Sequence, residues 1–178
     1  MHTTELYEII NRHGRWHSGQ PGGKRADLRG ADLRSAEMRW VNLSQGDLQG
    51  ADMTGADLSF STLSAANLSH ALMDKTTLYG ANLTGADLSY ATLTYATAER
   101  AQLNGAILTH ANLYSSNLKG ALLIDAHLQQ ADLTLALLRG ADLTNADLRG
   151  AKLERADLTY AVLRGVRLDD STLDGDIR

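Results

Sequence analysis

Six histidines are the side chains of this 178-residue sequence best suited to bind a metal or to move a proton near neutral pH. A metal site needs several ligands that converge on one point, and the chain has no cysteine to add to the histidines. The sequence contains neither a G-x-S-x-G motif nor a phosphate-binding glycine loop. We therefore expect surface histidines, no catalytic residue, no metal and no cofactor. The histidines are His2, His13, His17, His70, His110 and His127.

Acidic and amide side chains recur at intervals of five, as in ADLTNADLRGAKLERADL between residues 141 and 158. What such a row can do depends on the backbone that positions it. Stepping by five from Leu28 to Leu173 gives 30 positions, of which 26 hold leucine, three hold methionine and one holds alanine. The positions two residues earlier hold alanine in 23 cases and another residue of modest size in the rest. One small and one large apolar residue per pentapeptide therefore point inward.

A period of five fits neither a helix nor a flat strand. A helix would spread it around its circumference, and a strand would place successive leucines on opposite faces because five is odd. The pattern instead predicts a chain that turns a corner once per pentapeptide. Eleven of the 16 glycines lie two residues after the central leucine position, where a type II turn needs a positive φ.

Tandem A(D/N)LXX motifs over residues 26–175 resemble the pentapeptide-repeat family. The resemblance implies an all-β solenoid, a right-handed quadrilateral β-helix with four pentapeptides per coil and about 7–8 coils over residues 26–178. Stacking every twentieth residue then gives a structural core ladder of leucines. Its members are Leu28, Leu48, Leu68, Leu88, Leu108, Leu128, Leu148 and Leu168.

Residues 1–25 precede the repeats and are predicted to form a capping helix and a linker. Thr4 fits an N-cap and Gly14 a C′ position. Leu6, Ile9, Ile10 and His13 would share one face, which we interpret as a lid on the first coil. No comparable lid is recognisable at the other end, so a homodimer through the C-terminal coil is one possibility, and protection of that end by its aspartates is the other.

Charge and hydropathy exclude several classes of protein. The formal net charge is −4 and no apolar run is long enough to cross a membrane. We therefore expect a cytoplasmic protein that binds neither membrane nor nucleic acid directly. Arg29, Arg34 and Arg39 would ring the first coil, either as a solvated rim beside acidic residues or as a contact for an anionic partner. The six acidic residues in excess after residue 25 are divided among the sides with balances of about −3, −2, 0 and −1, so no side is strongly acidic.

Exposed aromatic residues supply the candidate interaction site. Tyr90, Tyr95, His110 and Tyr114 are predicted to project from adjacent coils, where they either stack on one another or form a contact patch. The sequence thus favours a non-catalytic rigid scaffold for an unknown protein partner. The alternative, taken from the family resemblance, is a DNA-mimicking binder of DNA gyrase or another topoisomerase.

Overall fold

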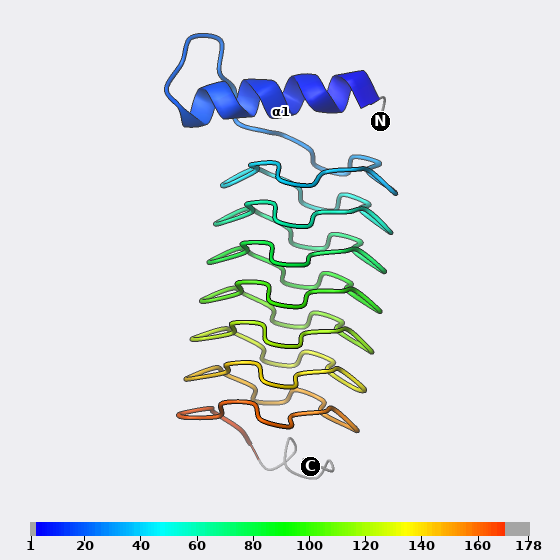
Figure 1. Cartoon of the computed structure of the whole chain (residues 1–178), viewed down its shortest axis with the longest axis vertical. Helices are drawn as coiled ribbons and strands as arrows, with labels where there is room; N and C mark the ends of the chain where they lie inside the picture. Colours follow the sequence, from blue (N-terminus) through cyan, green and yellow to red (C-terminus); the bar gives the residue numbers. More distant parts are fainter. Residues whose placement is uncertain (1–2, 170–178) are drawn as a thin grey trace.

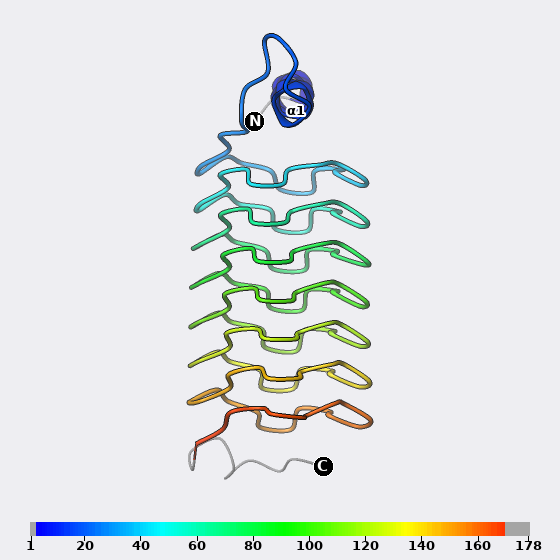
Figure 2. The same ribbon diagram turned by 90° about the vertical axis from the view of Figure 1, so that its left-hand side faces the viewer.

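The computed structural model describes residues 3–169 and shows one helix lying across the end of a solenoid of square coils (Figures 1 and 2). Helix α1 spans Thr3–His17. The described residues that follow contain isolated parallel β-bridges, each joining a residue to the one 20 positions later, from Asp27–Asp47 to Asp147–Arg167. A shift of 20 residues is four pentapeptides, so each coil has four sides and residues 26–165 make seven complete coils.

The four sides are numbered by the bridge residues at their centres. Side 1 carries residues 27 to 167 in steps of 20, side 2 carries 32 to 152, side 3 carries 37 to 157 and side 4 carries 42 to 162. Because a coil returns to the same side after 20 residues, side chains 20 positions apart lie in one column.

Leucine and alanine fill the interior of the tube. Leu28 and every twentieth residue up to Leu148 are buried. Leu168, at the end of the same column, is partly buried and packs against this core. A leucine is covered completely when coils lie on both sides of it, and among the described residues Leu168 has a coil on one side only.

The backbone hydrogen bonds of one repeat explain why it has five residues. The Leu28 N–H donates to Asp47 O of the next coil at 2.7 Å, and the Asp47 N–H donates back to Ala26 O at 3.0 Å. The corner closes when the Ala31 N–H donates to Leu28 O at 3.1 Å, and the Gly30 N–H reaches Gln49 O at 2.9 Å. Almost every buried polar group of the backbone must find a partner, and this pattern pairs four of the five N–H groups in each repeat.

Every described corner has a residue with positive φ at its second position, from Gly30 to Gly165. Eighteen of these 28 residues are not glycine, and none is β-branched. The first corner residues do not have a positive φ, so the corners have the type II pattern. An L-residue in this conformation is strained by roughly 1–2 kcal/mol, and a β-branched one by more.

Replacing Gly85 with alanine is expected to lower the free energy of unfolding by about 1 kcal/mol. A Cβ at Gly85 would meet nothing within 4 Å and φ is +65°, so the cost is conformational strain alone. The reverse change at the same corner of the preceding coil, Ala65→Gly, should raise the free energy of unfolding by a similar amount. Urea denaturation measures both, and equal signs for the two variants would contradict the explanation.

Helix α1 packs its apolar face on the first coil, with Leu6 and His13 buried and Ile9 and Ile10 partly buried against the core. Its ends differ from the prediction. Thr4 lies inside the helix, and Gly14 does too because the following residues continue to hydrogen-bond in helical geometry.

The helix ends in a Schellman motif five residues later than predicted. The Gly19 N–H donates to Trp16 O at 3.1 Å, the Gln20 N–H donates to Arg15 O at 2.8 Å, and Gly19 has a φ of 65°. Gly23 then passes so close to the helix that a Cβ would lie 2.3 Å from Trp16 N. The linker therefore holds α1 against the coil.

Candidate functional site

The histidines do not form a metal site in the part of the chain that the structure describes, where no three His, Asp or Glu side chains converge. His70 and His110 share a column but are separated by Tyr90, whose ring stacks on both at centroid distances of 5.1 and 4.8 Å. His13 is fully buried on the face of α1 that packs against the first coil.

The recurring aspartate and asparagine side chains accept hydrogen bonds from the backbone. The fifth N–H of each repeat, which belongs to the residue after the leucine, has no backbone acceptor in the pattern above. In repeats with Asp or Asn two residues earlier, that side chain can accept it, as when Asp52 Oδ1 accepts the Thr54 N–H at 3.0 Å and Asn112 Oδ1 accepts the Tyr114 N–H at 3.0 Å. This Asx interaction explains the D or N of the motif and uses its oxygen atoms for folding.

The arginines of the first coil are paired with acids. Arg29 and Arg34 each form two hydrogen bonds to the aspartate two positions earlier, with Nη2–Oδ2 distances of 2.7 and 2.6 Å to Asp27 and Asp32. The Arg29 guanidinium lowers the pKa of Asp27 to about 2, and Arg34 likewise holds the pKa of Asp32 well below its usual range. Arg39 pairs with an aspartate of the next coil at 3.2 Å. These pairs are half exposed, which favours the solvated rim.

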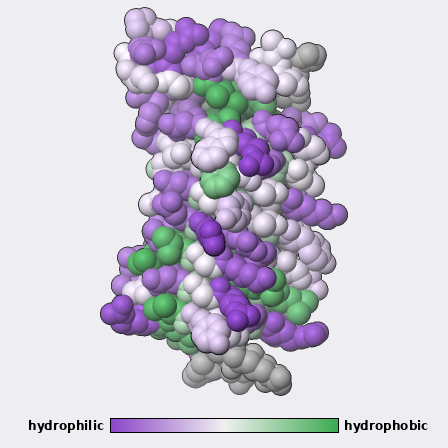
Figure 3. Space-filling model, in the orientation of Figure 1, coloured by the Kyte–Doolittle hydropathy of each residue, from purple (hydrophilic) through white to green (hydrophobic). Residues whose placement is uncertain are grey.

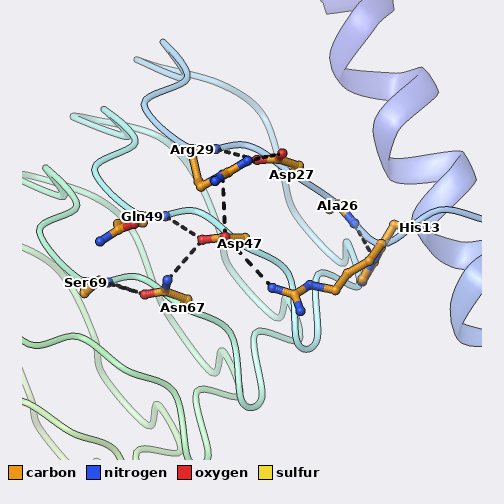
Figure 4. A network of polar contacts seen from close by, with 9 residues as sticks. His13, Ala26, Asp27, Arg29, Asp47, Gln49, Asn67 and Ser69 are labelled. Atoms are coloured by element: carbon orange, nitrogen blue, oxygen red, sulfur yellow. Dashed lines mark hydrogen bonds and ion pairs between the residues drawn. The ribbon is translucent and has the colours of Figure 1, made fainter.

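A polar ladder continues down side 1 from this rim (Figure 4). Asp47 lies 3.6 Å from Arg29 and accepts a hydrogen bond from Asn67 Nδ2 at 3.0 Å. Asn67 in turn accepts from the hydroxyl of Ser69 at 2.7 Å. The two contacts of Asp47 join side chains from successive coils, so they stabilise the stack.

Asp147 is the most enclosed acid of this side, with 5% of its surface exposed. It accepts two hydrogen bonds from Arg149, at 2.8 and 2.6 Å, and one from Gln129 Nε2 at 2.9 Å. The bond from Arg149 is the main reason that the pKa of Asp147 falls to about 2.

Asp147→Asn is expected to lower the free energy of unfolding at pH 7 by about 1–3 kcal/mol, because a charge-assisted network loses its anion. A carboxyl whose pKa is lower in the folded state stabilises that state above its unfolded pKa of about 3.9. The difference between wild type and variant should therefore shrink as pH falls from about 4 to 2. Denaturation at a series of pH values tests this, with exposed Asp27→Asn as the weaker control. A difference that does not depend on pH would contradict it.

The predicted aromatic residues lie along side 2 as two separate pairs. Tyr90 stacks face to face with His110 at the corner between sides 1 and 2, with an interplanar angle of 13°. Tyr95 meets Tyr114 edge to face at the corner between sides 2 and 3, at 5.9 Å and 85°. Thr92 lies at the centre of the side between the two corners.

One apolar residue of this side was missed by the sequence reasoning. Leu72 is 43% exposed at the bridge position where aspartate or asparagine is usual, and this departure from the motif was the available signal. We call Leu72, Tyr90, Tyr95, His110 and Tyr114 the tyrosine face.

Asp74 fixes the centre of the tyrosine face. It accepts hydrogen bonds from the Thr92 hydroxyl at 2.9 Å, from the Thr94 N–H at 3.1 Å and from the Thr94 hydroxyl. Thr92 stands where an Asx residue would accept the Thr94 N–H, and Asp74 of the preceding coil accepts it instead. Three donors therefore occupy this carboxylate and hold the face in one arrangement.

A second aromatic cluster lies at the corner between sides 3 and 4. Trp40 and Phe60 stack at 4.2 Å with an interplanar angle of 7°, and Tyr79 meets Phe60 edge to face at 5.4 Å. Gly80 leaves the space that Phe60 occupies, since a Cβ there would lie 3.1 Å from the ring. These rings pack on one another and on the coil below.

Hollows lie at both ends of the described part of the solenoid. One of about 320 Å³ lies between α1 and the first coil, lined in part by Leu6, Tyr7 and Leu33. Figure 3 shows apolar atoms just below α1. A hollow of about 100 Å³ lies at the last described coil. Within residues 3–169, no helix has the length and apolar character that crossing a bilayer would require.

Comparison with known proteins agrees with this architecture. The family model for pentapeptide repeats matches in overlapping segments from residue 24 to residue 175. The search of curated proteins found no match. Among solved structures, the pentapeptide-repeat protein Rfr23 from the cyanobacterium Cyanothece 51142 is 42% identical over 51% of this chain, with a TM-score of 0.50. The aligned part spans 61% of the Rfr23 chain.

Two further structures match over a longer part of the chain. HetL, a pentapeptide-repeat protein involved in heterocyst differentiation regulation from Nostoc sp. strain PCC 7120, is 30% identical over 89% of this chain and 92% of its own, with a TM-score of 0.32. QnrB1, a plasmid-mediated fluoroquinolone resistance protein, is 21% identical over 83% of this chain and 86% of its own, with a TM-score of 0.47. The five-residue repeats, the four-sided coils and the match to the family model together show that the chain belongs to the pentapeptide-repeat family and folds as its right-handed quadrilateral β-helix.

Proposed function

We propose that this protein is a rigid, non-catalytic scaffold that binds another protein through the tyrosine face. The observation that carries the proposal is the placement of Tyr90 and Tyr95, which are 53% and 56% exposed and have left-handed backbones with φ of 58° and 57°. Glycine occupies the same corner columns at Gly50 and Gly55. Tyrosine therefore occupies corners where glycine would adopt the same backbone conformation with less strain.

The chemistry of the tyrosine face favours a protein over a nucleic acid. Tyrosine supplies a rigid apolar ring with one polar tip and is enriched where proteins meet. A nucleic acid would need several cations for its phosphates. Lys75, at the edge of side 2, is one cation beside the face, and the carboxylate of Asp74 is enclosed by hydroxyl and amide donors.

The test is capture of a partner from the source cell by the immobilised full chain, followed by affinity measurement with the purified partner. Tyr90→Ala and Tyr95→Ala should each weaken binding by roughly thirtyfold if they act as hot spots worth about 2 kcal/mol. Tyr160→Ala is the matched control, because Tyr160 is 78% exposed at a corner between sides 3 and 4. Wild-type affinity in the Tyr90→Ala/Tyr95→Ala double variant, or an equal loss in the control, would refute the proposal.

The charge arrangement supports this choice over DNA mimicry. Duplex DNA carries one negative charge per roughly 1.7 Å of its axis, and a mimic needs a comparable unpaired row. Here Asp27, Asp32 and Asp147 are each hydrogen-bonded to an arginine. We therefore expect no protection or inhibition of gyrase supercoiling at micromolar protein, and either effect would favour the mimic.

The homodimer through the C-terminal coil is a separate proposal supported by the apolar end of the last described coil. Leu163 is 41% exposed there. Sedimentation analysis of the wild type against Leu163→Asp tests it, with a dimer expected only for the wild type. The residues around this hollow are Leu148, Leu153, Leu158, Leu163, Val166 and Leu168.

A further inference from the structure

The first coil has a backbone donor that its own repeat cannot satisfy. In later repeats the N–H of the first residue donates to the leucine carbonyl three positions earlier, as Ala31 does to Leu28 and Ala51 to Leu48. Ala26 is buried and begins the first repeat, so no leucine turn precedes it. Its N–H donates instead to His13 Nδ1 at 3.0 Å (Figure 4). His13 of α1 therefore replaces the missing corner carbonyl.

This bond defines the protonation state of the ring. A nitrogen that accepts a hydrogen bond carries no hydrogen, so His13 is neutral with its hydrogen on Nε2. Nε2 is buried and has no hydrogen-bond partner in the structure. The ring also stacks on Trp16 with a centroid distance of 5.3 Å. Protonation would add a hydrogen to Nδ1. Two N–H donors, those of Nδ1 and of Ala26, would then face each other in a site closed to water.

The surroundings of His13 oppose a positive charge. Burial is the main cause that lowers its pKa below the ordinary value of 6.5. The charged groups that act on it are His17 from α1 and Arg25 from the start of the first coil, and both lower it further. After burial, the second-largest effect comes from the backbone of Ser44 on side 4 of the first coil, which raises the pKa of His13 but by less than burial lowers it.

We propose that His13 is a pH-sensitive latch: neutral, it holds α1 over the first coil, and protonated, it releases α1 and uncovers the apolar end of the solenoid. The helix covers this end through Leu6, and Leu28 and Leu33 belong to the same core cluster. An isolated helix of 15 residues is marginal in water, so release should also unfold α1. The latch is independent of binding at the tyrosine face.

The direction of the pH effect follows from linkage. Well above pH 6.5 the ring is neutral in both the docked and the released form, so docking of α1 is strongest there and does not depend on pH. Below about 6.5 the released form binds a proton that the docked form excludes, and docking weakens by up to tenfold per pH unit until the docked pKa is reached. From its value well above pH 6.5, the equilibrium constant for docking should therefore fall by up to roughly thirtyfold at pH 5.0.

The test follows α1 in the full chain from pH 7.5 to 5.0. Since α1 is the one helix among the described residues, circular dichroism at 222 nm reports on it, and Trp16 fluorescence does so in a Trp40→Phe background. The wild type should lose both signals as pH falls while the coils remain folded. His13→Asn keeps an acceptor for Ala26 but does not titrate, so it should retain both signals, and His17→Asn should behave as the wild type.

A wild type that keeps α1 docked at pH 5.0, or a His13→Asn variant that releases it at the wild-type pH, would overturn the proposal. If α1 of the His13→Asn variant does not dock at any pH, NMR titration of the His13 ring in the wild type tests the proposal instead. Protonation of His13 together with release of α1 supports the latch, whereas a ring that stays neutral through the release refutes it.

Discussion

Leu88→Ala is expected to lower the free energy of unfolding by about 3–5 kcal/mol. Leu88 has no exposed surface and lies in its column between Leu68 and Leu108. The wall beside it is fixed by hydrogen bonds such as Leu88 N–H to Ile107 O at 2.7 Å. Because these bonds repeat in every coil, the wall cannot move inward locally without breaking several of them. The cavity left by the lost side chain should therefore remain nearly full size, which places the cost at the upper end for such substitutions.

Leu168→Ala is the matched control from the same column. Leu168 is partly buried, so the same chemical change should cost less than about 1.5 kcal/mol. Urea denaturation followed by the β-type circular dichroism signal measures both variants. Equal losses at Leu88 and Leu168 would contradict the assignment of the core to the coil interior.

Ala86→Leu is expected to have the second largest effect, a loss of about 2–3 kcal/mol from overpacking. Ala86 is fully buried, with Ala66 and Ala106 above and below it in its column. The flanking backbone is held close, since the Asp87 N–H donates to Ala66 O at 2.9 Å. Three additional carbon atoms can enter only by displacing this wall or the neighbouring leucines.

Ala86→Ser is the matched control, because serine already occupies the same column type at Ser61 and Ser116, both buried. It should cost less than about 1 kcal/mol if its hydroxyl finds a backbone carbonyl, as Ser61 does with Leu58 O at 2.7 Å. The double variant Ala86→Leu/Leu88→Ala conserves total volume but moves it to a different column. We expect no recovery of stability in the double variant, and a recovery would show that the two columns share one space.

The side chains at the corners can vary without changing the packing of the core. Each corner needs a positive φ, and its side chain points away from the core, so its size is limited only by neighbours in the same column, as at Gly80 beside Phe60. Glycine, alanine, tyrosine and arginine all occupy described corners, as at Gly85, Ala65, Tyr95 and Arg100. A side of the solenoid can thus acquire or lose a binding surface at a cost of about 1–2 kcal/mol per corner, without any change inside.

Several parts of the molecule were predicted from sequence because local chemistry decides them. The five-residue spacing of leucine and alanine predicts corners and an apolar interior at every repeat. The apolar face of α1 was also predicted, since Leu6 and His13 lie on it as expected. The end of the helix was not, because Gly14 is compatible with the helix interior and the Schellman motif forms at Gly19.

The sequence by itself determined that the chain is a solenoid built of pentapeptides, since every repeat carries the same information about what faces inward. The tertiary structure decided which side chains meet, because a period of five does not state how many repeats close a coil. Closure after 20 residues brings Tyr90 onto His110 and Asp74 onto Thr94. The tertiary structure also decided the contacts at the two ends. Leu168 is only partly covered there, and His13 accepts the Ala26 N–H, for which no repeat supplies an acceptor. Repeats specify the interior, whereas contacts between coils and at the ends depend on neighbours that are distant in the chain.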